Sequence, residues 1–404
     1  MKHTRGYCLM LIIGMAMLLG GCAAKQVPQF SPEDNPEHHY LRGMEALESE
    51  NLSDAQNKFE RAVYRNEKYA LGYAGLAIVS AYKAKGQTDN GLKKVESERA
   101  AAYLKKARKY ADTPEERCGC DLAVMRVAAI LKEKGWLEKA EDAYHDAMSL
   151  KINEQKLLYY QGKEAAPYFM GIAFLEAQEF QKARDRFSDV LNAKREGKWH
   201  EPSDRAWKKT DKIVRAVAGM TVGEVAKKIA MKDTVSRGDM AALLIDELKI
   251  DKLMAGRIPV RSEIEKSVAE FVPADIRENP FKEEIIVLMK WNVRGMEPKY
   301  DKSAMAYLFQ PADDVQRGEL ALILEDVLVK LTGDEKISSA YFNHEKSPFP
   351  DVRPTSPIYN AVMNMTTRGI MVGEYSGEFR ANQPVDGAEA LLAIRVLKQH
   401  INIY

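Results

Sequence analysis

One arrangement of small and large side chains occurs four times between residues 55 and 190. An alanine is followed four residues later by a large side chain, and a second small side chain or a valine follows after three more residues. This spacing places all three side chains on one face of an α-helix, where a second helix can approach closely over the small residues. The four copies are Ala55, Phe59 and Ala62; Ala100, Leu104 and Ala107; Ala140, Tyr144 and Ala147; and Ala183, Phe187 and Val190.

A second helix is predicted upstream of each copy, because helix-forming residues dominate residues 38–219 and apolar residues recur at helical spacing. Each upstream helix carries one small residue, namely Gly43, Ala77, Ala128 or Gly171. The helix pairs resemble the tetratricopeptide repeat (TPR), a helix–turn–helix unit that stacks into a superhelix. The resemblance implies a TPR-like helical repeat domain over residues 37–219, whose concave face binds an unknown protein ligand.

The spacing of the copies departs from that of the TPR family. The leading alanines lie 45, 40 and 43 residues apart, whereas a TPR has about 34 residues. Each gap therefore predicts longer helices or inserted loops, such as residues 87–97. A generic helical array with small residues at the helix crossings is the alternative, and both interpretations predict a curved scaffold.

A different pattern begins after residue 219 and also recurs. Residues 229–239, 309–319 and 379–389 align with one another, and each segment precedes an apolar stretch that is predicted to be helical. The second and third copies are also preceded by matching segments that end in Arg-Gly-Met and Arg-Gly-Ile.

In this order, the elements resemble the S-layer homology (SLH) domain. The third copy is closest, with Phe-Pro-Asp-Val at residues 349–352 and glycines at positions 369 and 373. The resemblance implies a three-unit SLH helical bundle over residues 220–404, and hence an all-α chain. The units lie at about 220–250, 271–331 and 349–400. Grooves between units of this family bind secondary cell-wall polymers or modified peptidoglycan.

By motif position, the resemblance assigns cell-wall polymer binding to Arg237, Asp239, Arg317 and Glu319. An arginine at the start of a helix can hold a carboxylate or phosphate with two hydrogen bonds. Structural arginines in internal salt bridges are the alternative. Since Gly387 occupies the arginine position of the third unit, at most two grooves are expected to bind polymer.

Local stability explains other parts of the SLH-like pattern. Ser236 can cap the helix that follows it, and Asp239 can complete a capping box. Gly295, Gly369 and Gly373 are predicted to be structural turn glycines with positive φ, where the first helix of a unit turns back.

The N-terminus predicts export and lipid attachment. Residues 1–21 combine two basic residues with an apolar run that is too short to span a bilayer. The run ends in Leu-Gly-Gly-Cys, which resembles the lipobox of bacterial lipoproteins and implies that Cys22 is lipidated and anchors the chain to the membrane. Ala23 then implies the periplasmic face of the outer membrane, and residues 22–36 form a tether. An ordinary cleaved secretory signal is the alternative.

Charge and motifs favour a protein without catalytic activity. The 60 Lys and Arg residues nearly balance the 59 Asp and Glu residues. The chain therefore lacks the excess of basic residues that would indicate a nucleic-acid partner. The seven histidines are scattered and no catalytic motif occurs, so no catalytic residue, metal or cofactor is predicted. Cys118 and Cys120 are expected to be small, partly buried residues near a helix start, with a strained bridge or a metal pair as alternatives.

These features predict a non-catalytic lipoprotein of the cell envelope that binds wall polymer through its SLH units and a protein partner through its TPR-like repeats. Such a protein would tether or scaffold the envelope. The alternative is an envelope assembly or secretion accessory lipoprotein, in which the SLH units are a structural cap that binds no glycan.

Overall fold

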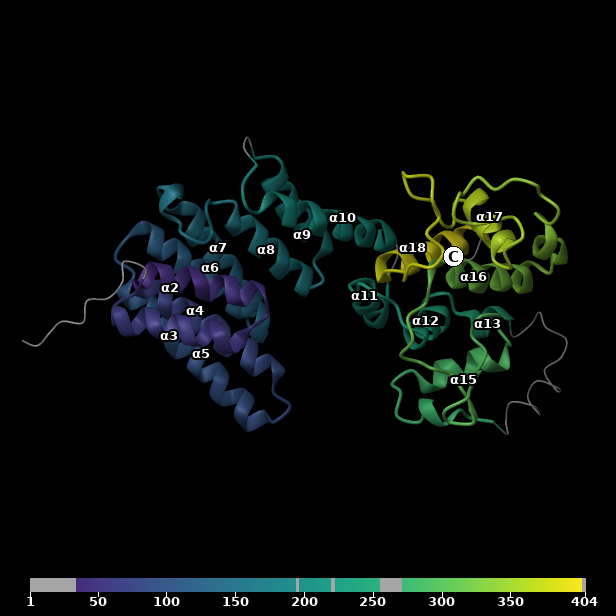
Figure 1. The fold of residues 1–404 in the computed structure, drawn as a ribbon, viewed down its shortest axis with the longest axis horizontal. Coiled ribbons are helices and arrows are strands. Elements are labelled where there is room, and N and C mark those ends of the chain that lie inside the picture. Colours follow the sequence, from purple (N-terminus) through teal and green to yellow (C-terminus); the bar gives the residue numbers. More distant parts are fainter. Residues whose placement is uncertain (1–33, 194–195, 219–221, 255–270, 402–404) are drawn as a thin grey trace, which may run out of the picture. The chain divides into compact units, whose positions relative to one another are not determined.

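The computed structural model describes residues 34–193, 196–218, 222–254 and 271–401. These residues form two compact units, one that ends at Phe169 and one that begins at Met170 (Figure 1). Both units are mainly helical, so the all-α prediction holds for the described ranges, apart from one two-stranded sheet. Cys22 and the predicted signal peptide lie outside the described residues. Within the described residues, no helix has both the length and the hydropathy of a transmembrane span.

The first unit is a stack of helical hairpins. Its described helices are α2 (Pro36–Glu48), α3 (Leu52–Arg65), α4 (Ala70–Gly86), α5 (Asn90–Tyr110), α6 (Pro114–Leu131), α7 (Trp136–Ser149), the short 3₁₀ helix η1 (Glu154–Lys156) and the beginning of α8 (Ala165–Glu176). Helix α2 pairs with α3, α4 with α5 and α6 with α7, and the first helices pack successively, α2 on α4 and α4 on α6 (Figure 1). The predicted helix pairs are therefore present in this unit.

The repeated small and large side chains form the contacts between these helices. Ala55, Phe59 and Ala62 of α3 are fully buried. A Cβ atom added at Gly43 or Gly75 would lie 2.5 Å or 2.4 Å from Cε1 of the Phe59 ring. The Phe59 ring can therefore pack against both α2 and α4 only because both positions are glycine.

The extra length of the repeats lies partly in a long helix and partly in one connection. The prediction of an inserted loop at residues 87–97 is wrong, because the Asp89 side chain accepts a hydrogen bond from Leu92 N (2.8 Å) and starts α5, which has 21 residues. The inserted connection is instead residues 150–164. It packs back onto the first helices, where the Tyr159 hydroxyl donates to Glu48 Oε1 (2.5 Å).

Helix α6 carries both cysteines of the described residues in its buried face. Cys118 and Cys120 are free thiols and are buried. Burial raises the pKa of the Cys118 thiol to about 11 and that of the Cys120 thiol to about 12. No group of metal-ligating side chains occurs among the described residues. As free and buried thiols, the two cysteines pack as small core side chains, more fully buried than expected.

The second unit contains the fourth hairpin from Met170 onward and the SLH-like copies. Its further elements are α9 (Phe180–Leu191), α10 (His200–Val217), α11 (Glu224–Ala230), α12 (Arg237–Ala242), the π-helix η2 (Leu243–Glu247), α13 (Ile250–Met254), η3 (Ala274–Ile276), α15 (Lys282–Lys290), β1 (Lys299–Asp301), β2 (Ala306–Leu308), α16 (Arg317–Thr332), η4 (Glu335–Ser339), α17 (Tyr359–Thr367) and α18 (Gly387–His400). Strands β1 and β2 pair antiparallel.

The observed division of the chain differs from the predicted domain boundary at residues 219 and 220. Helix α10 packs on α9 and also on α18, the last helix of the chain. Lys212 Nζ of α10 lies 2.9 Å from Asp386 Oδ2, at the start of α18. The fourth hairpin and α10 therefore share one unit with the SLH-like copies.

A closed ring of backbone hydrogen bonds joins the three SLH-like copies. Val315 N donates to Val235 O (2.8 Å), Val385 N to Val315 O (2.9 Å), and Val235 N to Val385 O (3.0 Å). The three valines hold equivalent positions in the aligned segments. Each copy therefore contacts the other two through the same backbone groups, and the copies are arranged around an approximate threefold axis.

The close contact between α4 and Phe59 gives a stability prediction. Gly75→Ala is expected to lower the free energy of unfolding by about 1–3 kcal/mol, because the new methyl group overlaps the buried ring. Gly86→Ala, at the open end of the same helix with no atom within 4 Å, is the matched control and should change stability little. Urea unfolding followed by circular dichroism measures both variants, and equal stabilities would contradict this packing argument.

Asp121 in α6 gives a pH-dependent prediction. Burial raises the pKa of this carboxyl from 3.8 to about 6, although Arg108 opposes the shift from 3.3 Å. The folded state therefore holds the proton more tightly than the unfolded chain does. It follows that the ionised carboxylate destabilises the fold above about pH 6, and that this penalty disappears below about pH 4.

Asp121→Asn is accordingly expected to raise the free energy of unfolding at about pH 7 by at most about 3 kcal/mol and to leave it unchanged near pH 3.5. Urea unfolding at the two pH values measures the difference. The same stabilisation at both pH values would show that the ionisation of Asp121 is not its source.

Candidate polymer-binding site

The first predicted polymer-binding arginine lies inside the second unit. Arg237 is the first residue of α12 and is 2% exposed. Its guanidinium donates to three carbonyl oxygens: Nε to Phe309 (2.9 Å), Nη1 to Gly295 (2.6 Å) and Nη2 to Glu297 (2.9 Å). The guanidinium carbon also lies 4.8 Å from the centroid of the Phe309 ring. Arg237 therefore connects the first copy to the loop of the second. We call such a contact between the start of one copy's second helix and the loop of the neighbouring copy a junction, and this one is the first.

The second arginine repeats this arrangement one copy further along the chain. Arg317 is the first residue of α16 and is 6% exposed. Its Nε donates to Phe379 O (2.8 Å), its Nη2 to Val372 O (2.8 Å), and its Nη1 pairs with the Glu389 carboxylate. The guanidinium carbon lies 5.0 Å from the centroid of the Phe379 ring. The bond from Nε to the phenylalanine carbonyl and the contact with the phenylalanine ring are thus the same at both junctions, whereas the partners of the Nη atoms differ.

This geometry favours the structural role for the two arginines over the ligand-binding role. All three nitrogens of each guanidinium already donate to groups of the neighbouring copy, and burial leaves almost no surface for a polymer to contact. Buried guanidinium groups need such acceptors, because an unpaired buried charge is strongly destabilising. Polymer binding by Arg237 and Arg317 therefore stays a prediction that would require these contacts to break.

The two predicted acidic residues cap the helices that the arginines begin. Asp239 Oδ2 accepts from Ser236 N (3.1 Å) and from Ser236 Oγ (2.9 Å), so the predicted capping box is present. Lys232 Nζ also donates to both Asp239 oxygens (2.7 and 2.8 Å). Glu319 closes the same kind of box with Gln316 N (3.0 Å), and its Oε1 lies 3.5 Å from Lys299 Nζ. Glu319 keeps more exposed surface than Asp239.

The third junction has no arginine because the backbone occupies its place. A Cβ atom added at Gly387 would lie 1.8 Å from Ile229 O. Ile229 holds the position in the first copy that Phe309 and Phe379 hold in the other two. The start of α18 therefore packs directly on the end of α11, and no side chain fits between them. The departure of Gly387 from the pattern thus has a steric cause.

Two of the three predicted turn glycines have positive φ. Gly295 has φ of +87° and Gly369 has φ of +66°, as the turn after each first helix requires. The prediction of positive φ at Gly373 is wrong. Glycine is favoured there because a Cβ atom would lie 2.8 Å from Cε1 of Phe349.

An aspartate, followed by valine in the third copy and by isoleucine in the second, holds the loop that receives an arginine. Asp351 accepts from Phe379 N (2.8 Å) and Arg380 N (2.7 Å). In the second copy, Asp275 accepts from Phe309 N (3.2 Å) and from the amide of the next residue (2.6 Å). These bonds fix the phenylalanine carbonyl that faces the guanidinium.

The sequence interpretation missed an exposed cluster beside the first junction. Lys299 and Tyr300 lie on β1 and Tyr307 lies on β2, where the two tyrosines are cross-strand partners with ring centroids 5.3 Å apart. The Lys299 side chain is 52% exposed, and the tyrosines are 53% and 57% exposed. The only sequence signal is length, since residues 295–309 exceed the equivalent residues 369–379 by four. We call these three side chains the hairpin cluster.

The buried arginines give a prediction about stability. Arg237→Ala should lower the free energy of unfolding of the second unit by about 3 kcal/mol or more, because three buried carbonyl groups lose their donor. Arg380→Ala is the matched control, since Arg380 is 43% exposed and lies 3.6 Å from Glu378, and should cost less than about 1 kcal/mol. Urea unfolding compares them, and similar losses would contradict the structural role.

Comparison with known proteins identifies one part of this module. Residues 348–391 match the S-layer homology domain family. The matched segment includes α17, the loop that receives Arg317 and the start of α18. No curated protein and no solved structure matches the chain. The chain therefore contains an S-layer homology domain, which suggests association with cell-wall polymers at the cell envelope.

Proposed function

We propose that this protein is a non-catalytic envelope lipoprotein that binds wall polymer through three SLH units and a protein partner through its TPR-like hairpins. The observation that carries the proposal is the SLH match at residues 348–391. The first two copies support it, because they share the valine ring and the arginine junctions with the matched copy. In this role the protein tethers or scaffolds the envelope.

The location follows from the N-terminal sequence. The lipobox-like residues 19–22 support lipidation at Cys22, and Ala23 supports delivery to the periplasmic face of the outer membrane. A chain anchored there by its N-terminus could contact peptidoglycan through its C-terminal unit. The ligand is then a secondary cell-wall polymer or modified peptidoglycan.

The hairpin cluster is the favoured contact for that polymer. Lys299 offers an accessible ammonium group to carboxylates or phosphates, and Tyr300 and Tyr307 offer exposed ring faces to sugar rings. Aromatic rings and cations of this kind commonly dominate binding surfaces. The cluster also lies beside Glu319, one of the residues that the SLH resemblance assigns to polymer binding.

A second candidate function is a structural cap within an envelope assembly or secretion system. The internal contacts of Arg237 and Arg317 and the closed junction at Gly387 favour it, because these features hold the bundle together without any ligand. In this case the partner-binding hairpins are the functional part of the chain, and no glycan is bound.

Sedimentation with purified sacculi distinguishes the two functions. The unaltered protein should pellet with sacculi, and the triple variant Lys299→Gln, Tyr300→Ser, Tyr307→Ser should reduce the bound fraction by about tenfold or more. Because all three side chains are exposed, the fold should persist. The matched control changes the exposed Lys336→Gln and Phe342→Ser of the same unit and should pellet normally.

Each outcome has a separate meaning. If the unaltered protein stays in the supernatant, wall binding is wrong and the structural cap is favoured. If the triple variant pellets like the unaltered protein, wall binding stands and the assignment to the hairpin cluster is wrong.

A further inference from the structure

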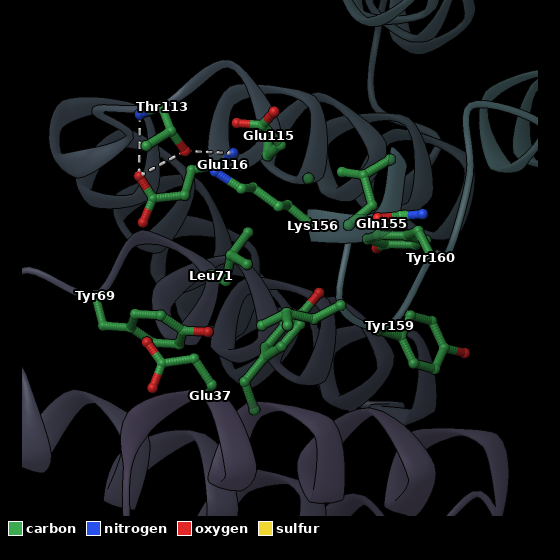
Figure 2. A pocket seen from close by; sticks show the side chains of 14 residues that line it. Glu37, Tyr69, Leu71, Thr113, Glu115, Glu116, Gln155, Lys156, Tyr159 and Tyr160 are labelled. Atoms are coloured by element: carbon green, nitrogen blue, oxygen red, sulfur yellow. Dashed lines mark hydrogen bonds between the residues drawn. The ribbon is translucent and has the colours of Figure 1, made fainter. Parts of the chain in front are cut away.

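A cavity of about 360 Å³ lies in the first unit, between the starts of α2, α4 and α6 and the connection that follows α7 (Figure 2). Its walls combine aromatic, aliphatic and acidic side chains. This volume is within the range of small-ligand sites. The lining side chains used below are Glu37, Tyr40, Tyr69, Glu115, Glu116 and Tyr160.

One polar group in this cavity lacks a partner. The Tyr69 hydroxyl is buried and has no hydrogen-bond partner among the described residues. Figure 2 shows that it points toward the middle of the cavity. Burial raises the pKa of Tyr69, and the carboxylates of Glu37 and Glu116 raise it further, so the hydroxyl stays neutral. A buried hydroxyl without a partner is costly, and a polar ligand group would satisfy it.

The ionisable side chains that line the cavity are mainly acidic, although the buried guanidinium of Arg126, which is not part of the lining, hydrogen-bonds Tyr160. Glu37 lies in the first turn of α2, and Glu115 and Glu116 lie in the first turn of α6, where the helix dipole stabilises ionised carboxylates. A hydrogen bond from the backbone N–H of Asn153 also lowers the pKa of Glu115. Lys156 is the one basic side chain of the lining. The lining therefore carries more negative than positive side chains.

The carboxylates of the lining differ in the hydrogen bonds that they already accept within the protein. Glu116 Oε2 accepts from Thr113 N (3.1 Å), and Glu115 Oε1 accepts from Asn153 N (2.7 Å). Glu37 makes no ion pair or side-chain hydrogen bond to another described residue. Its side chain is exposed, and its carboxylate is near enough to Tyr69 to raise the pKa of that hydroxyl (Figure 2). Glu37 is therefore the acceptor most available to a ligand.

The aromatic wall suits a cation with an apolar stem. Tyr40, Tyr159 and Tyr160 are almost fully buried and line the cavity with Tyr69. The faces of such rings attract cations, and their edges contact methylene groups. A purely apolar ligand would leave the Tyr69 hydroxyl unpaired, and an anion would be repelled by Glu37.

We propose that this cavity binds an ammonium group on an aliphatic stem, as presented by a lysine side chain of a partner protein. The inference deepens the proposed partner-binding role of the hairpins and rests on it for the source of the lysine. The ammonium donates to Glu37 and to the Tyr69 oxygen, while the methylene stem lies against the tyrosine rings. Wall binding by the second unit is independent of this site.

The test is a titration of the full-length protein with a fluorescein-labelled Gly-Leu-Lys-Leu-Gly peptide, followed by fluorescence anisotropy. Two matched peptides carry norleucine or ε-acetyl-lysine in place of lysine and should bind about tenfold more weakly or worse, because each removes the charge. Glu37→Gln and Tyr69→Phe should each weaken binding of the lysine peptide by about fivefold to tenfold.

Controls separate this site from general effects. Glu133→Gln and Tyr64→Phe change an exposed glutamate and an exposed tyrosine of the same unit and should bind as the unaltered protein does. Without peptide, Tyr69→Phe should melt at the same or a higher temperature, because its hydroxyl has no partner. This result would show that the weakened binding is not due to unfolding.

Several results would overturn the proposal. They are equal binding of the norleucine peptide, unchanged binding by Glu37→Gln and Tyr69→Phe, or no measurable binding of the lysine peptide. Sedimentation with sacculi is measured on the same preparations, so a failure of this site and a failure of wall binding are distinguishable.

Discussion

The second unit depends on backbone carbonyl groups that one SLH-like copy offers to the next. The ring of hydrogen bonds between Val235, Val315 and Val385 fixes the order of the copies around a shared axis. Arg237 and Arg317 then place guanidinium groups against carbonyls of the adjoining loops. A buried guanidinium is stable only when its N–H groups find acceptors. The facing loop supplies them, so the arginines stabilise the arrangement and most of their donors are used inside it.

Features that depend on neighbouring residues were predictable from the sequence. The helix pairs, the Ser236 capping box and the positive φ of Gly295 each follow from a few adjacent positions. The orientation of the Arg237 side chain was not predictable, because its acceptors lie about sixty residues or more further along the chain. The steric reason for Gly387 was hidden in the same way, since only the folded chain brings Ile229 O against it.

In the first unit, too, the sequence predicted one feature but left its structural form open. The spacing of the alanines predicted extra length but could not tell whether a helix or a connection absorbs it. Asp89 decides one case, because it caps α5 early. In the other case, the connection at residues 150–164 covers the first helices and forms one wall of the tyrosine-lined cavity. A cavity of this kind has no sequence signature, because its walls come from separate hairpins.

The junction at Gly387 differs from the other two junctions of the bundle. At two junctions a buried guanidinium donates hydrogen bonds to the neighbouring copy. The third junction depends instead on close backbone contact between α11 and α18. Helix α10 packs on α18 at this third junction. Lys212 forms an ion pair with Asp386, and the carbonyl of Arg215 accepts a hydrogen bond from Arg395. A fragment that begins at residue 220 would keep all three copies yet lose these contacts, so α10 belongs structurally with the SLH-like copies.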